Sequence, residues 1–109
     1  MDESISMIDG VERNRQHPAT FEIPTEAEKA AVMVGDFVKI GFELPNGQGE
    51  RMWVKVTGNG KGTLANDPVF MPMKHTQLVH FKPENILSII KGEGNEDQPT
   101  NKETPYGNG

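Results

Sequence analysis

Alternation of apolar and polar residues on either side of a glycine-rich turn is the strongest constraint in this sequence. Four apolar residues occupy every second position of one run: Val38, Ile40, Phe42 and Leu44. A period of two places such residues on one face of a β-strand. The run Glu50–Thr57 alternates in the same way, and Pro45-Asn46-Gly47-Gln48-Gly49 between the runs is rich in turn-forming residues. The pattern predicts a hairpin with one apolar face.

Shorter segments predict the remaining elements. Strands are expected at Thr63–Ala65, Gln77–Phe81 and Ile86–Ile90, with an irregular loop at 69–76 and a single turn at 82–85. Thr25 and Glu28 have the spacing of a capping box, and the following residues to Met33 are mostly good helix formers. The chain is therefore expected to be mainly β with one short helix (α+β). The strand pattern favours a small SH3-like β-barrel of about five strands.

Three parts of the chain differ in composition. Residues 25–91 hold the predicted strands and helix and form a single small domain. Residues 1–24 are expected to be an extended or partly disordered arm, because His17-Pro18 and Ile23-Pro24 favour extended backbone. Residues 92–109 contain no aliphatic side chain, so a disordered acidic tail is expected there.

Charge and residue usage exclude several classes of function. The chain has no cysteine, which rules out disulfides, thiolate metal sites and a cysteine nucleophile. The net charge of −5 argues against a nucleic acid partner, because binding to phosphates requires positive charge. Residues 35–91 alone are weakly basic, with seven bases against five acids. No run is long and apolar enough for a bilayer, and residues 1–10 do not read as a signal peptide, so no membrane partner and a cytoplasmic location are expected.

Several short motifs occur together in the order of a known family. They are Gly35-Asp36-Phe37-Val38-Lys39, Glu50-Arg51-Met52-Trp53-Val54-Lys55-Val56, Gly62-Thr63-Leu64-Ala65-Asn66-Asp67-Pro68, and Val79-His80-Phe81 before Glu84-Asn85-Ile86. In these motifs residues 17–90 resemble the small bacterial family called domain of unknown function 2314. This chain has His75-Thr76-Gln77 where members often have glycine and an acid. The resemblance implies a bacterial or phage origin and supplies no reaction.

No constellation for catalysis or metal binding is evident, so no catalytic residue, metal or cofactor is expected. The three histidines lie far apart in sequence: His17, His75 and His80. Three acids next to strand ends, Asp36, Glu50 and Asp67, are the candidates for an acid–base pair. Turn and solvation roles are commoner for acids at such positions.

Trp53 is the most informative residue, because it lies on the polar side of its predicted strand. Arg51 and Lys55 share that side, and Phe37 is expected across the hairpin. A basic aromatic surface of this kind suits an acidic peptide or a stacked base. The alternative, favoured because so small a domain needs buried surface, is that the helix or the Phe21–Ile23 segment covers Trp53 as part of the core.

Two functions remain open at this point. The first is a non-catalytic interaction module that binds a protein partner through the Trp53 surface. The alternative is a small-ligand sensor or minor enzyme with a site at the Asn66-Asp67-Pro68 turn, where Asn66 and Asp67 present polar groups. The same turn also suits a purely structural role, in which its side chains end a strand by bonding to the backbone.

Overall fold

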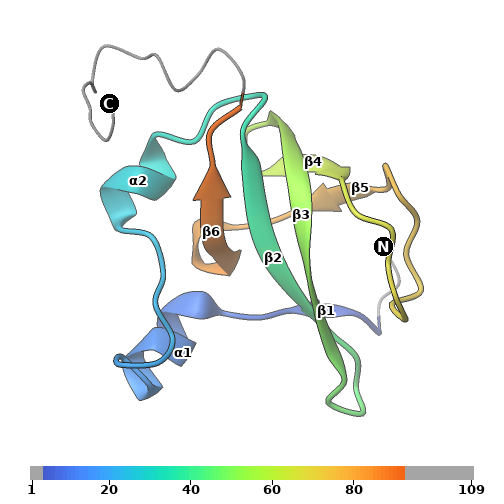
Figure 1. Cartoon of the computed structure of the whole chain (residues 1–109), viewed down its shortest axis with the longest axis horizontal. Coiled ribbons are helices and arrows are strands. Elements are labelled where there is room, and N and C mark those ends of the chain that lie inside the picture. The colour runs from blue at the N-terminus through green and yellow to red at the C-terminus, as the bar shows by residue number, and fades with distance from the viewer. Residues whose placement is uncertain (1–3, 93–109) are drawn as a thin grey trace.

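A computed structural model describes residues 4–92 of the chain. The elements, in chain order, are β1 (Ser6–Met7), α1 (Gly10–Gln16), α2 (Glu26–Ala30), β2 (Phe37–Glu43), β3 (Gly49–Gly58), β4 (Lys61–Leu64), β5 (Leu78–His80), the single 3₁₀ turn η1 (Pro83–Asn85) and β6 (Ile86–Ile90). Figure 1 shows them as a mainly β fold with two small helices at one side. The tail predicted for residues 92–109 lies outside the described residues, apart from Gly92.

The strands form one antiparallel sheet that curls into a half-barrel. Its order is β1-β2-β3-β4-β5, and β6 returns to pair with β2. Each of the five predicted strands is present within a few residues of its expected bounds, and the turn η1 precedes the last strand as expected. The mainly β, α+β class is therefore confirmed.

The predicted alternation of the hairpin is confirmed by burial. Val38 pairs with Val54 and Ile40 with Met52, which brings the apolar sets of β2 and β3 together on the inner face. The buried set comprises Val38, Ile40, Phe42, Met52, Val54 and Val56, none of which exposes more than 3% of its surface. Met71 and Met73 from the irregular loop fill the same core, so their predicted packing role is also confirmed.

The helix α2 begins as the capping box predicts. The Thr25 hydroxyl accepts a hydrogen bond from the Glu28 N–H at 3.1 Å, and the Glu28 carboxylate accepts one from the Thr25 N–H at 2.7 Å. The helix ends at Ala30, short of the predicted Met33. The chain instead turns at Gly35, whose φ of 98° suits glycine and whose N–H bonds to the Val56 carbonyl.

Residues 4–24 differ from the extended arm that their prolines suggest. Met7 in β1 pairs with Phe42, and α1 is capped by Asp9, whose carboxylate accepts a hydrogen bond from the Glu12 N–H. Ile5 and Ile8 expose only 5% and 8% of their surface. This segment is therefore a packed part of the domain, because its isoleucines bury apolar surface and its helix has a local cap.

Candidate functional site

The polar sides of β2 and β3 bring the predicted binding residues onto one surface. Lys39 lies directly across from Trp53, and Phe37 lies across from Lys55. Arg51, Trp53 and Lys55 share one side of β3, because the residues between them, Met52 and Val54, point into the core. We call these five residues (Phe37, Lys39, Arg51, Trp53 and Lys55) the cationic face.

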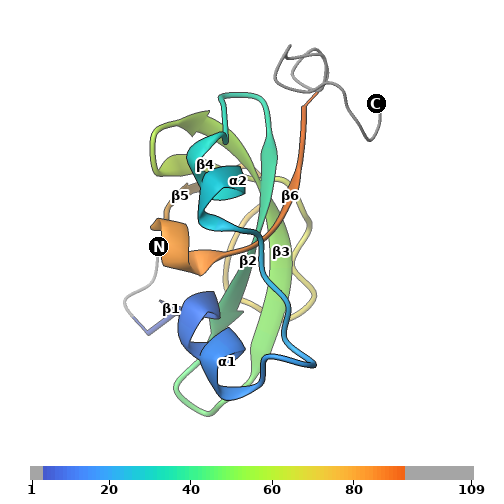
Figure 2. The ribbon, with the colours of Figure 1, turned by 90° about the vertical axis from the view of Figure 1, so that its left-hand side faces the viewer.

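Trp53 is half-buried and lies outside the core cluster, so its predicted role as a core residue was wrong. The Lys39 Nζ lies 5.0 Å from the centre of the Trp53 ring, a distance at which an ammonium is attracted to the π-face. The helix that was expected to cover Trp53 faces elsewhere. The α2 residues line a hollow together with Val56, a side chain of the inner face, and Figure 2 shows both helices on the same side of the β2–β3 hairpin.

Phe21, the other expected cover, contacts a different part of the face. Its ring lies 5.2 Å from the guanidinium carbon of Arg51, and its carbonyl oxygen accepts a hydrogen bond from the Asn14 side chain. Ile8 packs nearby over Gly41, where a side chain would meet the Ile8 Cδ1 at 2.6 Å. The N-terminal segment therefore covers the Gly41–Arg51 end of the outer sheet surface, and its residues 20–22 also line a hollow of about 190 Å³ that reaches Lys39.

One acid, Glu22, lies near the cationic face, where it lines a hollow together with Lys39 and Arg51. Among the described residues, no ion pair involves Lys39, Arg51 or Lys55. The two acids of strands β2–β6 are engaged elsewhere: Glu43 pairs with Arg13 at 3.3 Å, and Glu50 binds backbone amides. Lys39, Arg51 and Lys55 therefore outnumber the acid beside them, which leaves an excess of positive charge around the half-buried Trp53.

Asn66 lies next to the cationic face, because its side chain contacts the Trp53 backbone. Its side-chain oxygen accepts a hydrogen bond from the Trp53 N–H, while the Ala65 N–H donates to the Trp53 carbonyl at 2.9 Å. These bonds extend the β3–β4 pairing beyond Leu64. Asn66 therefore has the structural role expected for the Asn66-Asp67-Pro68 turn, in which a side chain ends a strand by bonding to the backbone. Asp67, the next residue, is exposed.

Asp36 and Glu50, two candidates for a catalytic pair of acids, have separate structural roles. Asp36 is fully buried and accepts hydrogen bonds from the Met33 and Gly92 N–H groups, and its carboxylate pairs with the Lys91 Nζ at 2.6 Å. Glu50 lies at the other end of the hairpin, since it pairs with Phe42 whereas Asp36 precedes Phe37. The two carboxylates are therefore not brought together.

Glu50 holds the irregular loop against β3. Its carboxylate accepts hydrogen bonds from the N–H groups of Val69, Phe70 and Met71 at 2.6, 3.2 and 3.1 Å. Partial burial acts to raise the pKa of Glu50, but the three amides favour the ionised form more strongly, so the pKa lies below its ordinary value. The ionised carboxylate is thus a fixed part of the loop.

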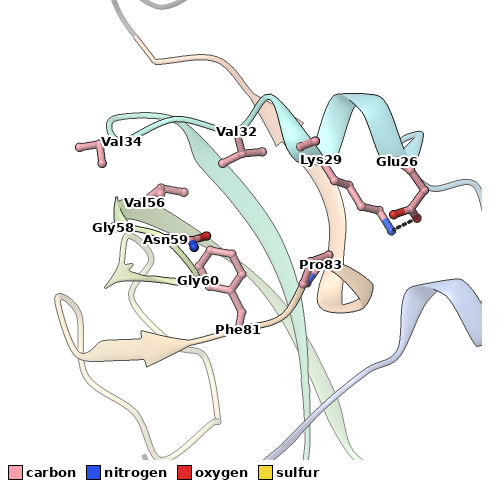
Figure 3. Close-up of a pocket in the computed structure, with 11 residues that line it drawn as sticks. Glu26, Lys29, Val32, Val34, Val56, Gly58, Asn59, Gly60, Phe81 and Pro83 are labelled. Carbon is pink, nitrogen blue, oxygen red and sulfur yellow. Dashed lines mark hydrogen bonds and ion pairs between the residues drawn. The ribbon is translucent and has the colours of Figure 1, made fainter.

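A hollow of about 410 Å³ lies between α2 and the turn that joins β3 and β4 (Figure 3). Its walls are mostly apolar, with Val32, Val56, Phe81 and Pro83 among the lining residues. The Lys29 side chain is 2% exposed, and its ammonium reaches Glu26 at 3.3 Å, away from the valines. The hollow therefore offers shape and apolar surface but no charged group at its centre. Sequence patterns did not indicate it, since its walls come from three separate segments.

The remaining tests for a site are negative within residues 4–92. No group of three or more His, Asp or Glu residues there is placed to hold a metal ion, and no helix of that part is long and apolar enough to cross a membrane. His17, His75 and His80 are all exposed, as expected for His80 from its place in the strand.

No protein-family model, curated protein or solved structure matches the chain. The resemblance to domain of unknown function 2314 therefore stays a prediction.

Proposed function

We propose that this protein is a non-catalytic interaction module that binds an acidic segment of a protein partner on the cationic face. The observation that carries the proposal is the Lys39–Trp53 pair, in which an ammonium lies over the ring of a half-buried tryptophan. Trp and Arg are the residues most often found at the energetic centres of interfaces. Lys39, Arg51 and Lys55 form no ion pair with a described residue, so carboxylates of a partner meet charges that are available to them.

The architecture supports a rigid platform for such binding. Trp53 is held by backbone bonds to Ala65 and Asn66, and Lys39 is fixed in register by β3 and β6. We assign the half-barrel to the SH3-like class, because a single 3₁₀ turn precedes a last strand that returns to pair with β2. A cysteine-free chain and an acidic protein partner are both compatible with the cytoplasm of a bacterium or of a cell infected by a phage.

The alternative, a small-ligand sensor or minor enzyme at Asn66 and Asp67, has less support. The Asn66 oxygen is already bonded to the Trp53 N–H. The two hollows of about 410 and 190 Å³ are lined by other residues. Nucleic acid ranks below both functions, because the net charge of −5 opposes contact with phosphates.

Binding of a fluorescently labelled octaglutamate peptide tests the interaction proposal. We expect the double variant Lys39→Gln/Lys55→Gln to bind the peptide roughly fivefold to tenfold more weakly than the wild type at low salt, because two partly exposed charge contacts are lost. The matched control is Lys74→Gln/Lys82→Gln, which removes the same charge from two exposed lysines outside the cationic face. Equal affinities of the two double variants would overturn the proposal.

A further inference from the structure

The Asp36 carboxylate fixes the point at which the chain leaves the sheet after β6. One of its oxygens accepts a hydrogen bond from the Gly92 N–H at 2.8 Å, and the other pairs with the Lys91 Nζ. Gly92 also approaches Gly35 so closely that a side chain at position 92 would lie 2.0 Å from the Gly35 carbonyl oxygen. Residue 92 therefore has a defined place, which sets where segment 93–109 begins.

That place is at one end of the cationic face. Ile90 in β6 pairs with Phe37 in β2, and Phe37 pairs in turn with Lys55 in β3. Gly92 follows Ile90 by two residues and is bonded to Asp36, the neighbour of Phe37. Segment 93–109 thus starts beside the Phe37–Lys55 end of the face.

The charge of segment 93–109 is opposite to that of the face. Its acids are Glu93, Glu96, Asp97 and Glu103, and its only base is Lys102, which leaves a net charge of −3. Two of these acids, Glu96 and Asp97, lie four and five residues beyond Gly92.

The segment is also long enough to cover the face. Arg51 and Lys55 are separated by four residues along β3, or roughly 13 Å of strand. The 17 residues of segment 93–109 span up to about 55 Å when extended. All three cations of the face are therefore within reach of the acids, and the tether holds these acids at a local concentration on the order of millimolar.

We propose that segment 93–109 occupies the cationic face of its own chain and competes there with the acidic partner. The inference rests on the proposed function, since it names the regulator of the same surface. The contacts between segment and face are charge–charge contacts at a partly exposed surface, so each is weak and is screened by salt. A partner displaces the segment when it carries more negative charge or adds apolar contacts to Trp53.

The experiment compares three full-length proteins. One is the wild type, and one is the neutralised variant Glu93→Gln/Glu96→Gln/Asp97→Asn/Glu103→Gln. The third is a control with the same four positions changed but their charge kept, Glu93→Asp/Glu96→Asp/Asp97→Glu/Glu103→Asp. Amide and indole signals in ¹H–¹⁵N NMR spectra show which residues change surroundings.

We expect the neutralised variant to shift the backbone signals of Lys39, Arg51 and Lys55 and the indole N–H of Trp53, while the control leaves them near their wild-type positions. The differences should vanish in about 1 M NaCl, where charges are screened within a few ångströms. Octaglutamate should bind the neutralised variant roughly threefold to tenfold more tightly than the wild type, because its competitor is gone. Shifts confined to the residues next to Gly92 would overturn the inference.

The peptide titration separates failure of this inference from failure of the proposed function. If Lys39→Gln/Lys55→Gln weakens binding but neutralising the segment leaves affinity unchanged, the inference fails and the binding face remains. If octaglutamate binds none of the proteins, the proposed function fails. The NMR spectra then decide on their own whether segment 93–109 lies on the face.

Discussion

The two faces of the β2–β3 hairpin are built from adjacent residues of the same strands, yet they differ in almost every physical property. The inner face is apolar, and Val38, Ile40 and Val54 on it are completely buried. The outer face presents Lys39 and Lys55 around Trp53, with no acid from the described residues paired to either lysine. A period of two therefore separates the residues that stabilise the fold from those available to a partner, so each set can change without the other.

The outer surface is itself divided. At the Gly41–Arg51 end, Ile8 packs over Gly41 and Phe21 lies against Arg51. At the other end Lys39, Trp53 and Lys55 have partly accessible side chains. The N-terminal segment thus adds buried surface to a small domain while leaving the tryptophan and two lysines accessible.

The largest effect is expected from a change on the inner face. Ile40→Ala should lower the free energy of unfolding by about 2 to 5 kcal/mol, because it removes buried methyl groups and leaves a cavity in a packed core. Ile40 is 0% exposed and pairs with Met52. Chemical denaturation followed by circular dichroism measures the change. A loss below about 1 kcal/mol would show that the inner face is not the main source of stability.

A smaller, pH-dependent effect is expected from the loop that Glu50 holds. Glu50→Gln should lower stability by about 1 to 2 kcal/mol at pH 7, because three backbone amides lose a charged acceptor. Since the pKa of Glu50 is lower in the folded protein, its contribution is present above the ordinary glutamate pKa and is lost as the pH falls through the folded value. The difference between wild type and variant should therefore shrink between about pH 5 and pH 3.

Denaturation curves at several pH values test this loop. Glu84→Gln is a suitable control, since Glu84 accepts no hydrogen bond from the loop that follows β4. A difference between wild type and Glu50→Gln that stays constant down to pH 3 would contradict the role assigned to the carboxylate.

The smallest effect on stability is expected from the outer neighbour of Ile40. Lys39→Ala should change the free energy of unfolding by less than about 0.5 kcal/mol, as is usual for surface substitutions. It removes the ammonium that lies over the Trp53 ring, so acrylamide should quench Trp53 fluorescence more strongly than in the wild type. Since Trp53 is the only tryptophan, the signal reports this site alone. Unchanged quenching would mean that Lys39 does not cover the ring in solution.

Most of the sheet was predictable because its signals are local. Alternation in residues 38–44 and 50–57 determined which side chains face the core, and Thr25 with Glu28 determined where α2 begins. The extended arm predicted for residues 1–24 was wrong where the structure describes it. That prediction rested on Pro18 and Pro24, but both prolines lie after α1 and do not interrupt it. Asp9 and Glu12 have the spacing of a helix cap, which is the local signal for α1.

The candidate site was predicted only in part, because its character depends on packing between distant segments. Alternation placed Trp53, Arg51 and Lys55 on one side of β3. It contained no information on which side α2 would pack, and therefore on whether Trp53 would be covered. The burial of Asp36 and its pairing with Lys91 join residues 55 positions apart, so no local pattern reveals them.

The Asp36 carboxylate has one more consequence, which concerns how this domain can be combined with others. It is bonded to Met33 just before the half-barrel and to Gly92 just after it. The polypeptide therefore enters and leaves the β2–β6 unit at nearly the same point in space. Proteins tolerate grafting of a foreign domain into a surface loop when the ends of the graft lie close together. Residues 33–92 have that geometry, but Ile5 packs in their core and Ile8 covers Gly41, so a host loop that received this unit would also have to supply the N-terminal segment.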